Sequence, residues 1–443
     1  MVKFLNKNNL LKNDMFNLAE KLWPINRSIT GKGIRESLRV IKKILPKLKI
    51  YSIKSGTKVF DWQVPLEWEI NEGWIKKPDG KKICDLKNNN LHVISYSTPI
   101  NKKVSLEQLK KNLFSIPKMP NAIPYVTTYY KRNWGFCLTN NEKIKLKKGT
   151  YEVFIDSKLF KGCLNYGELL IKGKSKKEIF LSTYLCHPSL ANNELSGPVV
   201  TTFLAKWIQS LKNKYYSYRI IFIPETIGSI SYLSRNLFTM KKNIYAGFNI
   251  SCVGDERTYS YLQSRKGNTI SDKIVKHVLK FIYPKYKNYS WKERGSDERQ
   301  YCAPLIDLPV AALMRSKYGA YPEWHTSLDK LGKVVTKKGL LGGFNALQLC
   351  LEAIEKNYYI KTKVLGEPQL GKRGLYPSIS TPESSATIKS KDVHLLLQLL
   401  TWGDGEHNLL DIADKLDEPI WNLYNIVDIL KKEKLIETKL HKF

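Results

Sequence analysis

Short apolar runs alternate with longer amphipathic segments after about residue 151, and this alternation constrains the fold more than any other feature of the chain. Five runs have the length and composition of buried strands: LLIKG, EIFLSTYL, YRIIFIPET, AGFNISCVG and LPVAALM. Helical patterns lie between or after them in GPVVTTFLAKWIQSLK, SDKIVKHVLKFIY and KKGLLGGFNALQLCLEAIEK. Strands and helices that alternate at this spacing predict an α/β fold, with a mixed, largely parallel sheet flanked by helices.

The segment of residues 51–149 has a different pattern. It alternates apolar and polar side chains, as in VFDWQVPLEWEINEGWIKK, and contains the turn signals Pro-Asp-Gly and Asn-Asn-Asn. This pattern predicts short strands and hairpins. We expect a small β domain here, inserted into an α/β domain that comprises residues 1–50 and 150–365.

A third region follows the Pro/Gly/Ser-rich linker GEPQLGKRGLYPSISTPESSA. Residues 375–443 show three helical patterns and a basic, strand-like end, which is the outline of a winged helix-turn-helix. Such domains often bind DNA through the second helix of the motif. Here that helix, IWNLYNIVDILKKEK, begins with apolar and acidic residues. We therefore interpret the domain as a protein-contact or dimerisation module, with DNA binding as the alternative.

The formal net charge is +33, and a strongly basic surface attracts nucleic acids. However, lysine is spread over the whole chain beside abundant Asn, Ile and Tyr, which is typical of an AT-rich coding bias. Arginine, the usual reader of phosphates and base edges, is scarce by comparison. Nucleic acid is therefore not the expected partner, and a preference for anionic partners or substrates is the alternative.

The sequence lacks three features that are typical of membrane or secreted proteins. No apolar run approaches the roughly 20 residues that a membrane helix needs, so no membrane association is expected. The N-terminal segment MVKFLNKNNLLKND lacks the apolar core and cleavage site of a signal peptide. Seven cysteines without regular spacing fit a reducing environment. We expect a cytoplasmic protein.

Four residues with reactive side chains follow predicted strands or precede them in loops. His187 follows FLSTYLC, Glu225 lies in PETIGS, Asp297 in RGSDERQY and His325 in YPEWHTSLD. In open α/β sheets, ligands bind in the crevice at the carboxyl ends of the strands. Imidazoles and carboxylates are the ligands of catalytic zinc, and a carboxylate that is not held by the metal can accept a proton from water.

The order of these motifs, H…NNELSG…PETIGS…SDERQY…EWHTSLD, resembles the zinc-dependent aminopeptidase clan, which includes di-zinc aminopeptidases, glutamate carboxypeptidases and single-zinc glutaminyl cyclases. The resemblance covers residues 150–360 and the N-terminal helices. With an inserted β domain and a C-terminal winged helix, the chain is similar to a bacterial aminopeptidase-like family often associated with surface-polysaccharide loci. The resemblance implies a zinc-exopeptidase-like fold, with His187 and His325 as zinc ligands, Glu225 as general base and Asp297 in support.

Three departures from the clan's pattern lower the negative charge. Asn193 stands in place of a bridging aspartate, Thr226 in place of a ligand glutamate and Ser251 where a further aspartate often occurs. Two close zinc ions carry four positive charges, which a buried site must offset with anions. We therefore expect a single zinc ion, with Asn193 as a weak oxygen donor and Glu225 as the carboxylate. Glu194 and Asp297 are alternative carboxylates, and the sequence leaves open whether Glu225 is a ligand or the base.

The expected function is that of a metal-dependent hydrolase of amide or peptide bonds, aminopeptidase-like, acting on a small peptide or an amide-bearing metabolite. Arg265, Arg299 and Arg315 are candidates to hold a substrate carboxylate, and a surface ion pair is the alternative for each. A non-catalytic binding or scaffold protein and a winged-helix regulator are the alternative functions. A homo-oligomer would follow if the winged helix pairs two chains.

Overall fold

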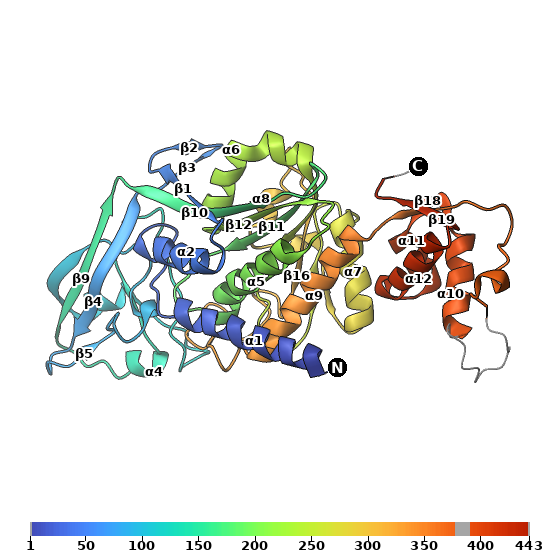
Figure 1. Ribbon diagram of the computed structural model, residues 1–443. Coiled ribbons are helices and arrows are strands. Elements are labelled where there is room, and N and C mark those ends of the chain that lie inside the picture. Colours follow the sequence, from blue (N-terminus) through green and yellow to red (C-terminus); the bar gives the residue numbers. More distant parts are fainter. Residues whose placement is uncertain (1, 377–389, 442–443) are drawn as a thin grey trace. The chain divides into compact units, whose positions relative to one another are not determined.

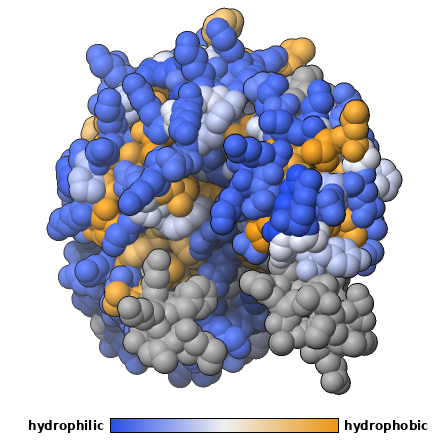
Figure 2. All heavy atoms as spheres, turned by 45° about the vertical axis from the view of Figure 1, so that its right-hand side comes forward, coloured by the Kyte–Doolittle hydropathy of each residue, from blue (hydrophilic) through white to orange (hydrophobic). Residues whose placement is uncertain are grey.

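The computed structural model describes residues 2–376 and 390–441, which form two compact units (Figure 1). Unit 1 comprises Met1–Asp272 and Lys285–Asn345, and unit 2 comprises Lys273–Pro284 and Ala346–Phe443. The face drawn in Figure 2 is covered mainly by hydrophilic side chains, with scattered hydrophobic ones between them.

An eight-stranded mixed sheet forms the centre of unit 1. In spatial order its strands are β1 (Lys49–Lys54), β10 (Cys163–Ile171), β12 (Ser217–Ile223), β11 (Glu178–Tyr184), β13 (Ile244–Asn249), β16 (Val310–Met314), β14 (Ser260–Leu262) and β15 (Lys287–Tyr289). The four strands β12, β11, β13 and β16 run parallel, whereas β1, β10 and β12 pair antiparallel, as do β14 and β16. The predicted mixed, largely parallel sheet is thus confirmed.

Helices cover both faces of this sheet. α5 (Ser196–Ser210) connects β11 to β12, and α6 (Ile227–Asn243) connects β12 back across β11 to β13. Right-handed connections that run in opposite directions lie on opposite faces. α1 (Val2–Leu22) and α2 (Lys32–Ile44) pack with α5, while the short α8 (Glu298–Tyr301) packs with α6 (Figure 1). The order of the strands therefore reverses beside β11, which is where a ligand crevice is expected.

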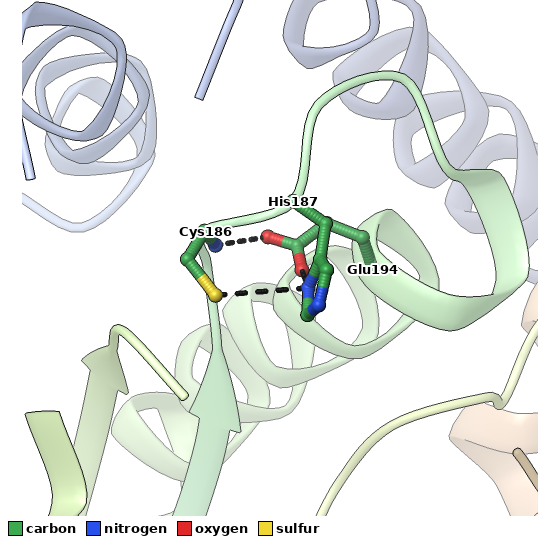
Figure 3. Close-up of side chains that lie close together, drawn as sticks. All are labelled: Cys186, His187 and Glu194. Atoms are coloured by element: carbon green, nitrogen blue, oxygen red, sulfur yellow. Dashed lines mark hydrogen bonds and ion pairs between the residues drawn. The ribbon is translucent and has the colours of Figure 1, made fainter. Parts of the chain in front are cut away.

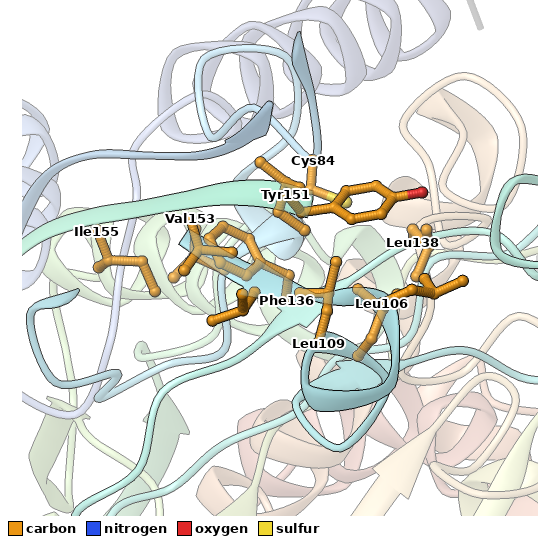
Figure 4. Close-up of a cluster of buried hydrophobic side chains, with 12 residues drawn as sticks. Cys84, Leu106, Leu109, Phe136, Leu138, Tyr151, Val153 and Ile155 are labelled. Carbon is orange, nitrogen blue, oxygen red and sulfur yellow. The ribbon is translucent and has the colours of Figure 1, made fainter. Parts of the chain in front are cut away.

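A separate four-stranded antiparallel sheet lies in the inserted part of unit 1. Its spatial order is β5 (Lys82–Ile83), β4 (Glu67–Lys76), β9 (Thr150–Phe160) and β6 (Ile100–Ser105). Phe136, Tyr151, Val153 and Ile155 belong to its apolar core (Figure 4). β9 extends the small sheet past residue 149, because it pairs with β4 almost along its whole length. At the other end, β1 belongs to the large sheet.

The remaining elements of unit 1 are short. They are the β2–β3 hairpin (Lys58–Val59 and Trp62–Gln63), the parallel pair β7 (Leu113–Phe114) and β8 (Phe136–Cys137), α3 (Leu106–Lys110), α4 (Asn140–Lys143), η1 (Asn90–His92), η2 (Ala191–Leu195) and η3 (Trp291–Glu293). α7 (Ile270–Ile282) and α9 (Lys337–Glu355) each have residues in both units.

Unit 2 contains the predicted winged helix. Its helices are α10 (Ser390–Thr401), α11 (Leu409–Leu416) and α12 (Ile420–Lys432), with η4 (Gly371–Arg373) before them, and its sheet has the order β18 (Asp404–Asn408), β17 (Tyr359–Thr362), β19 (Ile436–Lys439). His277 from α7 joins this core, because its Nδ1–H donates to Asp414 (2.6 Å) and its Nε2 accepts from the backbone of Ile420 (2.9 Å). Residues 377–389, which include the end of the expected linker, lie outside the described residues.

All seven cysteines are free thiols. Over residues 2–376 and 390–441, no helix is both long and apolar enough to cross a membrane.

Candidate active site

His187 lies three residues beyond the end of β11, and its ring is held from behind. Its Nδ1–H donates to Glu194 Oε2 (2.7 Å), as Figure 3 shows. Arg27 Nε donates to the carbonyl oxygen of His187 (3.1 Å). Because Nδ1 is occupied, Nε2 is the ring nitrogen that remains for another ligand. Burial opposes a positive charge here, but Tyr125, Cys186 and Glu194 hold the pKa of His187 well above its ordinary value.

A wide π-helical turn, η2, directs Glu194 at His187. In this turn the backbone N–H of Leu195 donates to the carbonyl oxygen of Leu190 (3.3 Å), which lies five residues earlier in the chain. Such turns insert an extra residue at a helix start and are frequent at functional sites. Glu194 Oε1 also accepts a short hydrogen bond from the backbone of Cys186, so both carboxylate oxygens face the loop that carries His187.

The negative charge of Glu194 has a buried counter-charge. Arg27 Nε lies 3.8 Å from Glu194 Oε1, and both side chains are fully buried. Burial lowers the pKa of Arg27, and Glu194 opposes this shift. The positive charge of Arg27 therefore offsets the negative charge of Glu194, and Glu194 does not provide charge to offset a metal ion.

Cys186, His187 and Glu194 offer ligand atoms within 4.8 Å of one another (Figure 3). A metal ion in this cluster would need His187 Nδ1, which already donates to Glu194. Burial raises the pKa of Cys186 to about 11, so the group is a thiol and not a thiolate. We interpret the cluster as the support of His187, whose Nε2 points the other way.

Glu225, two residues beyond β12, faces that free nitrogen. Glu225 Oε2 lies 3.7 Å from His187 Nε2, and Oε1 accepts from Ser296 Oγ (2.7 Å). The backbone N–H of Glu225 donates to Cys186 Sγ (3.3 Å), which joins the ends of β11 and β12. Burial raises the pKa of Glu225, and the neighbouring His187 opposes the shift.

Asp297 lies behind Glu225 and fixes the start of α6. Its Oδ1 accepts from Thr226 N (2.7 Å) and from Ser229 Oγ (2.8 Å). Thr226 has a φ of 64°, which is a strained conformation for a β-branched residue. The two hydrogen bonds accepted by Asp297 stabilise this conformation. Burial, followed by the charge of Glu225, raises the pKa of Asp297 to about 8. Its Oδ2 is buried without a hydrogen-bond partner.

His325, from the loop after β16, lies beside His187. The centroids of the two imidazoles are 5.5 Å apart, and the Trp324 ring stacks on His325 at 3.8 Å. Tyr125 from the inserted part contacts both histidine rings edge-on at 5.0 and 5.2 Å, and its backbone N–H donates to His325 O (2.8 Å). Burial and the proximity of His187 lower the pKa of His325 to about 3, so its ring is neutral.

Asp329 connects the His325 loop to η2. Its two carboxylate oxygens accept from the backbone N–H groups of Asn192 (2.8 Å) and Asn193 (3.0 Å). Asn193 Oδ1 accepts from Trp324 Nε1 (2.7 Å), and its buried Nδ2 has no partner. Asn193 Oδ1, the oxygen predicted to bind a metal, therefore already accepts a hydrogen bond from Trp324. The spacing of WHTSLD places Trp324 and Asp329 where each can contact η2.

The predicted substrate-binding arginines have different surroundings. Arg299 Nη2 donates to Thr226 Oγ1 (2.7 Å), directly beside Glu225. Arg265 forms an ion pair with Asp307 (2.8 Å). Arg315 is buried, and its guanidinium carbon lies 3.9 Å from the centroid of the Tyr259 ring. Only Arg299, among these three, is hydrogen-bonded to a residue of the Glu225 loop.

Two imidazoles and one carboxylate lie near one another, since Glu225 faces His187 Nε2 and the His325 ring lies beside the His187 ring. Imidazoles and carboxylates are the groups that hold zinc in catalytic sites, where one position is left for water. The buried Oδ2 of Asp297 has no hydrogen-bond partner, and Asp297 would add negative charge to the site only when it is ionised. Two carboxylates offset one divalent cation but not two.

Sequence motifs alone did not identify Tyr125, Ser296 or Arg27. Tyr125 comes from the inserted part and Arg27 from the turn after α1, both far from the motifs in the chain. Ser296 directly precedes Asp297, so a hydroxyl next to the predicted acid was the available signal.

The large sheet, the two histidines at its carboxyl edge and the added winged helix define an aminopeptidase-like protein with a zinc-exopeptidase fold. Residues 16–357 match the family described as a domain of unknown function, DUF4910, and the chain belongs to this family. Residues 357–438 match a winged helix-turn-helix family.

Similar proteins agree with this class. A protein of Clostridium acetobutylicum, provisionally named for polysaccharide biosynthesis and an aminopeptidase-like domain, is 43% identical over 436 residues, 98% of each chain. The crystal structure of a provisionally named peptidase from Clostridium acetobutylicum has a TM-score of 0.91 at 41% identity and covers 99% of both chains. The zinc aminopeptidase of Bacillus subtilis has a TM-score of 0.57 at 13% identity over 78% of this chain and 94% of its own, which shows a shared fold.

Proposed function

We propose that the protein is a hydrolase of amide bonds that uses a single zinc ion. The observation that carries the proposal is that His187 has both other groups beside it, with 3.7 Å between its Nε2 and Glu225 Oε2 and 5.5 Å between the His187 and His325 ring centroids. His187 and His325 would hold the ion. The zinc aminopeptidase name of a protein with this fold supports the choice of metal.

When bound, zinc would polarise the amide carbonyl and lower the pKa of water. Glu225 is the proton acceptor in this proposal, because Ser296 holds Oε1 while Oε2 faces the histidines. A carboxylate whose pKa burial raises can take a proton from water and return it to the leaving amine. Asp297 positions Glu225 through the start of α6, and Arg299 would bind a carboxylate of the substrate.

A non-catalytic binding protein is the second candidate. The observation in its favour is the neutral character of Asn193 and Thr226, at positions where related enzymes are expected to have carboxylates. In that case the crevice would bind a ligand without hydrolysing it, and zinc would be weakly held or absent.

Metal analysis of the full chain separates the two candidates. We expect about one zinc per chain, lost when His187 and His325 are both replaced by Ala. His92→Ala is the matched control, because His92 is a half-buried histidine of unit 1 whose Nδ1 is hydrogen-bonded to Cys137 O (2.8 Å). It is expected to keep the zinc. A wild-type protein that takes up no zinc under metal-replete conditions would contradict the hydrolase proposal.

Activity is then measured on aminoacyl anilides, dipeptides and N-acetylated sugars. Glu225→Gln is expected to keep the zinc and to lower the rate by about a hundred- to ten-thousandfold, since it removes the proton acceptor. A Glu225→Gln protein with undiminished activity would exclude this role for Glu225. If the wild-type protein binds zinc but hydrolyses none of these amides, the binding-protein alternative is favoured.

A further inference from the structure

A pocket of about 760 Å³ opens in unit 1 between the β2–β3 hairpin and the loop of residues 128–132. This volume lies within the range of small-molecule sites. Side chains that combine aromatic rings with polar or basic groups line it: Trp62, Gln63, Tyr129, Tyr130, Lys131 and Arg132. None of these residues belongs to the candidate active site described above.

Two tyrosines connect the pocket to the histidine pair. Tyr129 lines the pocket, and its hydroxyl lies 2.7 Å from that of Tyr125. The Tyr125 ring in turn contacts the rings of His187 and His325. On the other side of the pocket, β2 contacts α6, the helix that directly follows the Glu225 loop. The side chains of Tyr129 and Tyr125 would therefore lie between a ligand in the pocket and the histidine pair.

The exposed rings at the pocket provide flat apolar surfaces. Trp62 is 38% exposed and Tyr130 62% exposed, and their rings meet at 5.7 Å between centroids. The C–H face of a sugar ring is apolar and packs on such surfaces, while its hydroxyls remain free to form hydrogen bonds. Gln63 and Thr128 supply polar groups for the hydroxyls.

The charged side chains of the pocket indicate which class of sugar it would bind. Lys131 and Arg132 are both exposed at its edge, whereas Asp61 is the single acidic side chain in its lining. The lining thus has an excess of positive charge. Exposed cations of this kind attract an anionic group, and the guanidinium of Arg132 can bind a carboxylate or phosphate in bidentate fashion.

We propose that this pocket binds a sugar ring that carries a negative charge and belongs to a larger substrate, whose amide group is bound at the histidine pair. The second half of this statement rests on the proposed hydrolase function, whereas binding itself does not require zinc. The name of the Clostridium acetobutylicum relative, which refers to polysaccharide biosynthesis, agrees with a substrate of this class.

Calorimetric titration of the full chain tests the proposal with four probes: glucuronic acid, glucose 1-phosphate, N-acetylglucosamine and inorganic phosphate. We expect an anionic sugar to bind more tightly than the neutral one, and the carboxylate and phosphate probes identify which anion is preferred. Trp62→Ala should weaken binding by about tenfold, as expected for the loss of one stacked ring. Arg132→Gln should remove the preference for the anionic probe and leave binding of the neutral sugar unchanged.

Phe238→Ala is the matched control, because Phe238 is 83% exposed on α6 and does not line the pocket. It is expected to bind like the wild type. Equal binding by Trp62→Ala and wild type, no binding of either anionic sugar, or equally tight binding of inorganic phosphate, which has no sugar ring, would overturn the proposal. Zinc content is measured on the same samples: sugar binding without zinc contradicts only the proposed function, and zinc without sugar binding contradicts only this inference.

Discussion

Replacing Arg27 by Met tests the internal support of the site, independently of any metal. Arg27 and Glu194 are fully buried, with 3.8 Å between Nε and Oε1. At an effective dielectric constant of about 20, two unit charges at this distance attract each other by about 4 kcal/mol. Loss of one partner from a buried pair costs about 3–5 kcal/mol, because the other charge remains buried alone. We therefore expect Arg27→Met to destabilise unit 1 by about 4 kcal/mol.

Arg265→Met is the matched control. Arg265 forms a closer ion pair, with 2.8 Å between Nη2 and Asp307 Oδ1, but the two side chains are 38% and 25% exposed. Exposed pairs contribute about 0–1 kcal/mol, since solvent screens the charges. Distance alone would rank the two arginines in the wrong order, whereas burial predicts the larger loss for Arg27.

A double-mutant cycle isolates the charge pair. Glu194→Gln leaves Arg27 buried without its anion, and we expect a loss similar to that of Arg27→Met. Arg27→Met combined with Glu194→Gln removes both charges, so its loss should fall short of the sum of the single losses by about 2–3 kcal/mol.

Hydrogen exchange followed by mass spectrometry is the suitable assay, because a chain with two compact units need not unfold in one step. Peptides from η2 and α5 report the local free energy of opening where Glu194 lies. The reasoning is refuted if Arg27→Met and Arg265→Met cause equal changes in these peptides. It also fails if the losses of the two single mutants simply add in the double mutant.

Three further changes probe the same region. Glu194→Gln should weaken zinc binding by about 10–100-fold in a chelator competition, because it loosens the hold on His187, and an unchanged affinity would argue against the proposed ligand. Asp329→Ala leaves two backbone N–H groups of η2 without acceptors, and exchange in η2 should reveal a loss of about 2–4 kcal/mol. Gly197→Ala places a Cβ 2.5 Å from Ile250 O, so a lower melting temperature is expected, corresponding to about 1–3 kcal/mol; an unchanged temperature would mean that α5 can shift freely.

The sequence predicted the large sheet and the approach of the two histidines for the same reason. Parallel strands have their carboxyl ends at one edge, so loops that follow different strands meet there. His187 after β11 and Glu225 after β12 follow this rule directly. His325 lies eleven residues beyond the end of β16, so the strand alone does not determine where it lies. The motif that it shares with Asp329, which binds the backbone of η2, was needed to predict its position.

Contacts that depend on distant segments were not predictable in this way. Tyr125 reaches the histidines because the inserted part folds back on the large domain, and no local pattern encodes that return. Glu194 was predicted as an alternative carboxylate ligand of the metal. The π turn instead places it at Nδ1 of His187, on the other side of the ring from Nε2. The small sheet extends beyond the expected boundary at residue 149, because β9 alternates in burial from its first residue and pairs with β4.

The distribution of charge explains how a site with few carboxylates can be complete. Glu194 is neutralised by Arg27, so it supports His187 without contributing to the charge of the crevice. Glu225 and Asp297 then provide at most two negative charges, which match one divalent cation and would leave a second uncompensated. In the proposed site, the neutral residues at the other ligand positions of the clan are consistent with a single ion.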